Sequence, residues 1–129
     1  MAVNMSDLTG TWDMVHDDWR GTLVINPSDQ ILNGVEGNCQ YRSYVIDGTW
    51  TGGDGVKRGV RGHFQGKDLK RRTSETCKWS DHLVTFQINF GADNPRQPFE
   101  GYVFSRAKRT MSGYTWWAGM PFSWYATKR

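Results

Sequence analysis

The sequence predicts an all-β protein, a single eight-stranded antiparallel β-barrel with up-and-down topology, and three observations predict it. Short segments alternate apolar and polar residues with the period of a β-strand, and turn residues separate them. The 129 residues include seven Trp, five Tyr, six Phe and 15 Gly, a composition typical of strands and tight turns. Trp12 lies near one end of the chain and the cations Lys128 and Arg129 lie at the other, so paired terminal strands would let a cation stack on the indole ring.

Eight clear strands follow from this alternation, and a weaker Gly-rich segment at residues 31–40 is expected to form a short strand with bulges. No helix is predicted, and the charged segment 66–80 is expected to be a long loop or a short edge strand. No shift in composition divides the chain, so residues 1–129 are expected to form one domain. In chain order the clear strands are 9–17, 19–26, 41–51, 56–65, 83–90, 99–105, 111–117 and 122–128.

The first four strands are each recognised by an apolar face and by the turn that follows it. Strand 9–17 carries Trp12 and His16 on one face and ends at the acidic pair Asp17-Asp18. The turn after the second strand is Asn-Pro-Ser-Asp, and the turn after the third is Gly-Gly-Asp-Gly. The residues that share one face in the second, third and fourth strands are Trp19, Gly21, Leu23 and Ile25, then Tyr44, Ile46, Gly48 and Trp50, then Val56, Val60 and Phe64.

The last four strands follow the same logic. Strand 83–90 has the strongest alternation, and residues 91–98 contain two prolines and are predicted to be a loop. A charged turn at residues 106–109 separates the next two strands, and the final hairpin is expected to turn at residues 119–121. The side chains of strand 83–90 expected to point inward are Val84, Phe86, Ile88 and Phe90.

Composition and charge restrict the classes of function. The formal net charge of +3 permits an anionic partner without requiring one, and the basic clusters lie in predicted turns mixed with acids, so nucleic acid is not the expected partner. No apolar run is long enough for a membrane span and no apolar signal region begins the chain, so a cytoplasmic protein is expected. Cys39 and Cys77 have no metal-ligand spacing and are expected to be free thiols; no metal or cofactor is expected.

The segment Leu8-Thr9-Gly10-Thr11-Trp12 resembles the first strand of the calycin group, which comprises lipocalins, fatty-acid-binding proteins and avidins. These proteins share a Gly-x-Trp in strand one, and lipocalins pack a C-terminal Arg or Lys over that Trp, a role that Lys128 or Arg129 could fill. The string Thr-Gly-Thr-Trp is most similar to avidin-like barrels. The short polar residues that hold biotin in avidins are absent after Trp12, so the resemblance implies the barrel and not the ligand.

A binding site is predicted at the barrel mouth, where aromatic rings would supply rigid apolar area and a few polar groups would orient a ligand. Arg58 lies in phase with apolar residues and predicts an anionic group on the ligand; the alternative is an Arg that is solvated or paired within the protein. For the aromatic residues the alternative is ordinary core packing. The predicted site residues are His16, Trp19, Tyr44, Trp50, Arg58, Trp116 and Trp124.

The leading functional hypothesis is a non-enzymatic binding barrel for a small hydrophobic or amphipathic ligand, possibly anionic. A carbohydrate-binding module that uses exposed Trp is the first alternative, and a small barrel enzyme such as a cyclase or isomerase is the second. The sequence contains no nucleophile elbow, phosphate loop or metal-binding helix, and no catalytic residue is predicted. Because Trp116 and Trp117 must point to opposite faces of their strand, one of them points outward and needs cover, which a sugar, another loop or a second protomer could supply. A homo-oligomer is the expected assembly.

Overall fold

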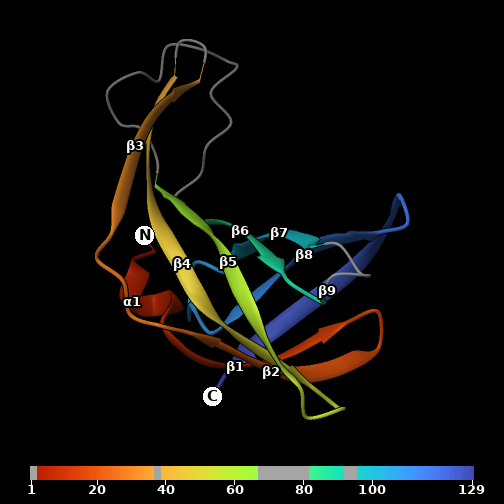
Figure 1. Ribbon diagram of the computed structural model, residues 1–129. Helices are drawn as coiled ribbons and strands as arrows, with labels where there is room; N and C mark the ends of the chain where they lie inside the picture. The colour runs from red at the N-terminus through yellow and green to blue at the C-terminus, as the bar shows by residue number, and fades with distance from the viewer. Residues whose placement is uncertain (1–2, 37–38, 67–81, 92–95) are drawn as a thin grey trace.

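The computed structural model describes residues 3–36, 39–66, 82–91 and 96–129. Within these ranges the chain forms one short helix and nine strands, and all paired strands are antiparallel (Figure 1). The elements are α1 (Met5–Leu8), β1 (Gly10–His16), β2 (Trp19–Ile25), β3 (Ile31–Glu36), β4 (Cys39–Gly52), β5 (Lys57–Gly66), β6 (Leu83–Ile88), β7 (Gln97–Val103), β8 (Thr110–Trp117) and β9 (Met120–Lys128).

Eight of the nine strands close into a barrel, as the sequence predicts. Each strand from β4 to β9 pairs with the next, β9 pairs with β1, and β1 pairs with β2. The ring closes because β2 also pairs with the C-terminal part of β4, from Gly21 opposite Gly52 to Ile25 opposite Gly48. β3 lies outside the ring and pairs with the N-terminal part of β4, where both strands extend beyond the barrel (Figure 1).

Several boundaries differ from the predicted ones. The weak segment 31–40 is two elements, since β3 ends at Glu36 and β4 already begins at Cys39. The last hairpin turns at Ala118-Gly119, which both adopt positive φ, so β9 begins at Met120 and includes Pro121. Positive φ at both central residues is the geometry of a two-residue turn, which needs fewer residues than the predicted loop. α1 was not predicted because four residues carry no helical period.

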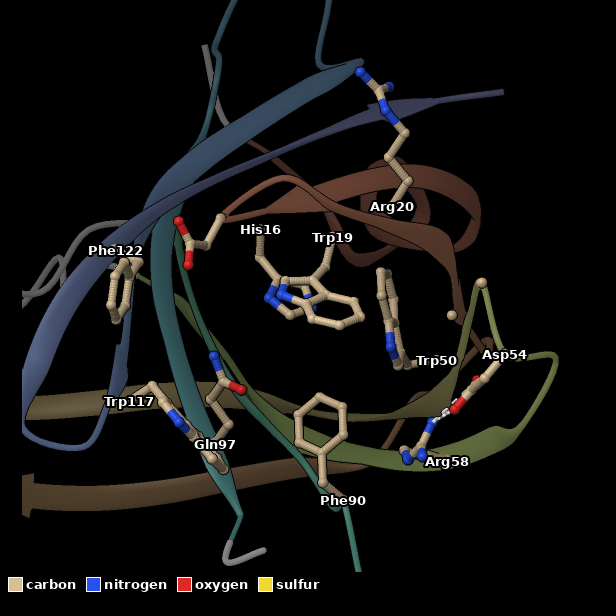
Figure 2. Close-up of a pocket in the computed structure, with 13 residues that line it drawn as sticks. His16, Trp19, Arg20, Trp50, Asp54, Arg58, Phe90, Gln97, Trp117 and Phe122 are labelled. Carbon is tan, nitrogen blue, oxygen red and sulfur yellow. Dashed lines mark hydrogen bonds and ion pairs between the residues drawn. The ribbon is translucent and has the colours of Figure 1, made fainter.

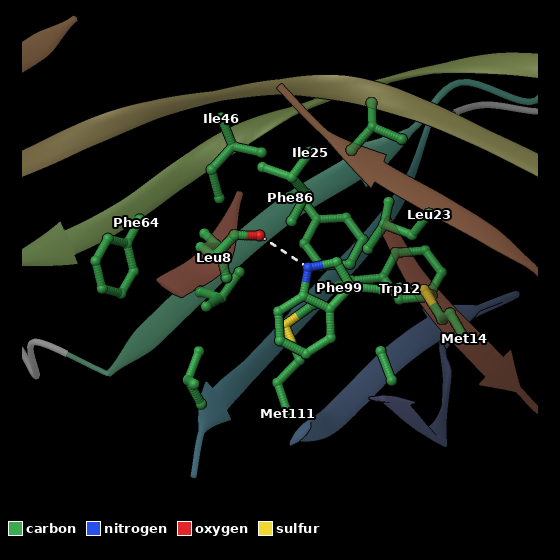
Figure 3. Close-up of a cluster of buried hydrophobic side chains, with 14 of the residues drawn as sticks. Leu8, Trp12, Met14, Leu23, Ile25, Ile46, Phe64, Phe86, Phe99 and Met111 are labelled. Atoms are coloured by element: carbon green, nitrogen blue, oxygen red, sulfur yellow. Dashed lines mark hydrogen bonds between the residues drawn. The ribbon is translucent and has the colours of Figure 1, made fainter. Parts of the chain in front are cut away.

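The barrel interior is filled by the inward faces of the strands (Figure 3). In β6 the alternation places every second side chain in the core, and β1, β2, β4 and β5 contribute in the same way. The rings of Phe86 and Phe99 stack with centroids 5.0 Å apart, and Trp124 meets both edge-on. The largest fully buried side chains include Trp12, Trp124, Phe64, Phe99, Leu8, Met14, Leu23, Ile25, Ile46, Ile88, Met111 and Val60.

One end of the barrel is closed by α1 and the segment around it. Leu8 is fully buried, and its carbonyl accepts a 2.8 Å hydrogen bond from the indole N–H of Trp12 (Figure 3). The ammonium group of Lys128 lies 5.9 Å from the Trp12 ring centroid and donates to the carbonyl of Asp7. The predicted cation over Trp12 is therefore confirmed as Lys128, while Arg129 forms an ion pair with Asp13 at 2.8 Å. Side chains of α1 thus fill this end of the barrel interior, and the cavity described below lies at the opposite end.

Candidate ligand-binding cavity

A cavity of about 500 Å³ occupies the end of the barrel opposite α1. The turns of three hairpins, β1–β2, β4–β5 and β8–β9, surround it together with the start of β7 (Figure 2). Its volume lies in the range of small-molecule sites. The lining residues are His16, Asp17, Trp19, Arg20, Trp50, Gly52, Gly53, Asp54, Arg58, Phe90, Gln97, Trp117 and Phe122.

His16 is surrounded by aromatic rings at the inner end of the cavity. Its ring centroid lies 5.2 Å from that of Trp50 and 5.4 Å from that of Phe99, which it meets edge-on. The residue is 7% exposed, and this burial lowers the pKa of the imidazole, although the neighbouring Asp17 opposes the shift. At pH 7 the ring is therefore neutral and offers one hydrogen-bond donor and one acceptor.

Arg58 lies at the rim and has a partner within the protein. Its guanidinium group forms an ion pair with Asp54 at 3.1 Å and lies 5.3 Å from the ring centroid of Phe90. Asp54 also accepts a hydrogen bond from the backbone N–H of Val56, and this bond, followed by Arg58, lowers the pKa of its carboxyl. The charge of Arg58 is thus matched by a fixed carboxylate, which is the paired alternative that the sequence left open.

Gln97 supplies a polar group that the sequence did not predict. The side chain is 7% exposed, and its amide nitrogen donates to the hydroxyl of Thr115 at 2.8 Å. That hydroxyl donates in turn to the carbonyl of Pro98 at 2.8 Å. The carboxamide oxygen of Gln97 accepts no hydrogen bond from any residue in the described part of the chain, and Figure 2 shows it directed toward the cavity.

Gln97 was missed because residues 91–98 read as a proline-rich loop. The strand instead begins at Gln97, and its buried positions are Gln97, Phe99, Gly101 and Val103. Extending the alternation of Phe99 and Val103 back by one period would have placed Gln97 on the inward face. Pro98 is compatible with this strand because its side chain points outward and it pairs with Gln87.

The outer rim of the cavity is apolar and exposed. Trp19 is 70% exposed and Trp117 is 41% exposed, and both line the opening together with Phe122. The whole tip of the β8–β9 hairpin, residues 117–122, carries no charged side chain. Because Trp117 lines the cavity, its neighbour Trp116 must lie on the opposite face of β8.

The structure brings four of the seven predicted site residues together at the cavity: His16, Trp19, Trp50 and Arg58. Trp124 is buried in the core instead, where its indole N–H donates to the carbonyls of Glu100 and Tyr114. Tyr44 stacks against Phe64, and neither ring lines the cavity. Periodicity gives the face of a strand but not the depth along the barrel axis, which is why these residues were grouped with the site.

Other predictions concern residues away from the cavity. In the turn after β7, Lys108 pairs with Asp7 at 3.7 Å and Arg109 donates to the carbonyl of Lys128, so both have structural partners. The basic cluster at residues 67–78 lies outside the described residues. The same is true of Cys77, so the predicted free thiols of Cys39 and Cys77 stay a prediction.

Among the described residues, no group of three or more His, Cys, Asp or Glu side chains is placed to hold a metal ion. No helix in the described ranges has the length and apolar character needed to cross a membrane. No protein-family model, curated protein or solved structure matches the chain. The function must therefore be argued from the cavity and the residues that line it.

Proposed function

We propose that the protein is a non-enzymatic, calycin-like binding barrel that holds a small hydrophobic or amphipathic ligand in its mouth. The observation that carries this proposal is the 500 Å³ cavity at the one end of the barrel that α1 does not plug. Small-molecule sites are typically concave and mostly apolar, with a few fixed polar groups. Trp50, Phe90 and Trp117 supply the apolar walls here, and His16 and Gln97 supply the polar groups.

The calycin relationship is part of this proposal. It is supported by Gly10-x-Trp12 in β1, by Lys128 over the Trp12 ring and by the plugged end of the barrel. These features hold the terminal strands together at the closed end and leave the other end free for a ligand. They say nothing about which ligand is bound.

The lining favours an uncharged ligand over an anionic one. An anionic group at Arg58 would have to compete with Asp54, whose carboxylate is already held by Val56 and by the guanidinium group. Charge-assisted hydrogen bonds of this kind are roughly twice as strong as neutral ones, so displacing Asp54 costs part of what a new anion would gain. An anionic group of the ligand would therefore gain little at Arg58.

Carbohydrate binding is a second candidate, because Trp19 and Trp117 expose indole rings beside the opening. Flat aromatic faces of this kind can stack against apolar faces of sugars. An enzymatic role has less support: His16 makes no hydrogen bond to another side chain in the described part of the molecule, so no acid–base pair is formed with it.

The test is isothermal titration calorimetry with naphthalene and with methyl α-glucoside, on the wild type and on two matched variants. We expect naphthalene to bind, Trp117→Ala to weaken its binding about three- to tenfold, and Trp116→Ala to leave it unchanged, because only Trp117 lines the cavity. Binding of the glucoside alone would replace the leading proposal with the carbohydrate one. Binding of neither compound would refute both.

A further inference from the structure

We infer that the inner wall of the cavity recognises a hydrogen-bond donor, a hydroxyl or N–H group, on an uncharged ligand, and that Gln97 determines this preference. The inference rests on the proposed binding function and goes beyond it, because it specifies the chemistry of the ligand's polar end. It depends on three features of the described residues: the orientation of the Gln97 amide, its burial and the balance of charge around it.

The orientation of the Gln97 amide is fixed by a chain of two hydrogen bonds. The hydroxyl of Thr115 has a single proton, and the carbonyl of Pro98 at 2.8 Å can only accept, so that proton goes to Pro98. Toward Gln97 the hydroxyl can then only accept, and the group that it meets at 2.8 Å must be the amide NH₂. The carboxamide oxygen is consequently held on the other side, facing the cavity (Figure 2).

Burial makes this oxygen selective. Gln97 is 7% exposed and Thr115 is fully buried, so the amide cannot turn away into solvent. A ligand that fills the cavity excludes water from the oxygen, and an acceptor left without a donor loses the free energy of its hydration. A ligand that brings a donor replaces the lost water, whereas a ligand with only acceptor atoms places two oxygens against each other.

The charges around the cavity favour an uncharged ligand. Arg58 is paired with Asp54, and burial lowers the pKa of His16, so neither residue leaves an unmatched charge at the inner end. Asp17 and Arg20 also line the cavity, with opposite charges. Figure 2 shows the guanidinium group of Arg20 directed away from His16 and Gln97, so an ionised ligand at the inner end would lose its hydration without meeting a counter-charge there.

The experiment compares four compounds that share one ring system: naphthalene, 2-naphthol, 2-methoxynaphthalene and 2-naphthoate. Calorimetry on the wild-type protein should show 2-naphthol binding about three- to tenfold more tightly than 2-methoxynaphthalene, the range that one hydrogen bond supplies. The carboxylate should bind no more tightly than naphthalene. If 2-naphthoate is the tightest ligand, the site is an anion site at Arg58 and the inference is wrong.

Two variants separate the role of Gln97 from general packing. Gln97→Met retains the length of the side chain and removes the oxygen, so 2-naphthol and 2-methoxynaphthalene should bind equally. Thr115→Val removes the hydroxyl that orients the amide, so Gln97 can present either end and the preference should fall below about twofold. The control is Thr85→Val, which removes a hydroxyl-to-carbonyl bond with His63 on the outer face and should leave the preference intact.

The outcomes distinguish this inference from the proposed function. If naphthalene itself fails to bind, the proposed cavity function fails. If all uncharged compounds bind wild type and Gln97→Met alike, the binding function stands and the donor preference is refuted. Thermal unfolding of each variant checks that it is folded, and Thr115→Val tests the same claim if Gln97→Met is not.

Discussion

The charge or orientation of each polar side chain at the cavity is determined by a different neighbour. His16 lies among Trp50, Phe90 and Phe99, and burial holds it neutral. Arg58 reaches the rim and is fixed by Asp54. Gln97 is oriented by Thr115, which belongs to a neighbouring strand. Residue type alone therefore does not determine the role, because the partner comes from another part of the chain.

His16 should make the stability of the protein fall as the pH drops below about 6.5. Its pKa is lower in the folded state than in the unfolded state, so as the pH falls through 6.5 the unfolded chain takes up the proton first. The contribution of His16 to the free energy of unfolding is complete above pH 6.5 and is lost as the pH falls toward the lowered folded-state pKa. The slope from one such group is at most about 1.4 kcal/mol per pH unit.

The measurement is urea unfolding of the wild type and of His16→Phe at several pH values from 7 down to 5. The carboxylates, His63 and His82 are common to both proteins, so the difference between the two curves reports on His16. The variant should lose less stability than the wild type between pH 6.5 and 5. Parallel curves would show that His16 titrates as it does in the unfolded chain.

At the scale of the strands, the seam between β2 and β4 depends on a close backbone approach at Gly48. A Cβ atom at this position would collide with the carbonyl oxygen of Val24 on the facing strand, so only Gly fits. This pairing closes the ring, because it joins the last open edge of the sheet. The sequence presents Gly48 merely as one member of an alternating face.

Replacing Gly48 with Ala should lower the free energy of unfolding by about 2 kcal/mol or more, because the two strands must separate to admit the methyl group. Gly59, which pairs with Thr49 one register position away, is the matched control: a Cβ there meets nothing within 4 Å. Gly59→Ala should be neutral or stabilise slightly, since Ala loses less backbone entropy than Gly on folding. Equal effects in denaturant unfolding would contradict the close approach at the seam.

The strands show how far alternation carries a prediction. The alternation correctly identified the buried faces of β1 and β6, because side chains two positions apart in a strand lie on the same face. It did not identify how deep each residue lies, so Trp124 and Tyr44 were assigned to the mouth. Depth is set by strand tilt and register, which arise only when β9 pairs with β1 and β2 pairs with β4.

At the scale of the whole molecule, the outer wall formed by β7, β8 and β9 exposes a group of aromatic side chains. Tyr102, Tyr114 and Tyr125 are each about half exposed or more, and they come from three adjacent strands. Trp116 lies on the same face of β8 as Tyr114. Exposed aromatic groups of this kind are typical of protein–protein interfaces, and a second copy of the chain is the partner that we propose.

We expect the protein to self-associate through this wall, and light scattering coupled to gel filtration checks it. Tyr114→Lys should shift the wild-type assembly toward the monomer, because it places a charge in the centre of an apolar contact. Trp19→Lys changes an exposed aromatic at the cavity mouth and should leave the assembly intact. A wild type that is monomeric at all concentrations would refute the expectation, and dissociation by Trp19→Lys alone would move the interface to the mouth.

The pairing of β1 with β9 has a consequence for how the chain folds. Asp13 and Arg129, which form an ion pair across these strands, are 116 positions apart in the sequence. A contact between residues so far apart forms only after a long loop has closed, and closing that loop costs conformational entropy. Barrels of this type therefore fold slowly. During synthesis the edge of β1 has no partner until β9 has left the ribosome, and the nascent sheet stays open to pairing with other chains. The open edge of β1 is therefore most exposed to aggregation just before β9 becomes available to pair with it.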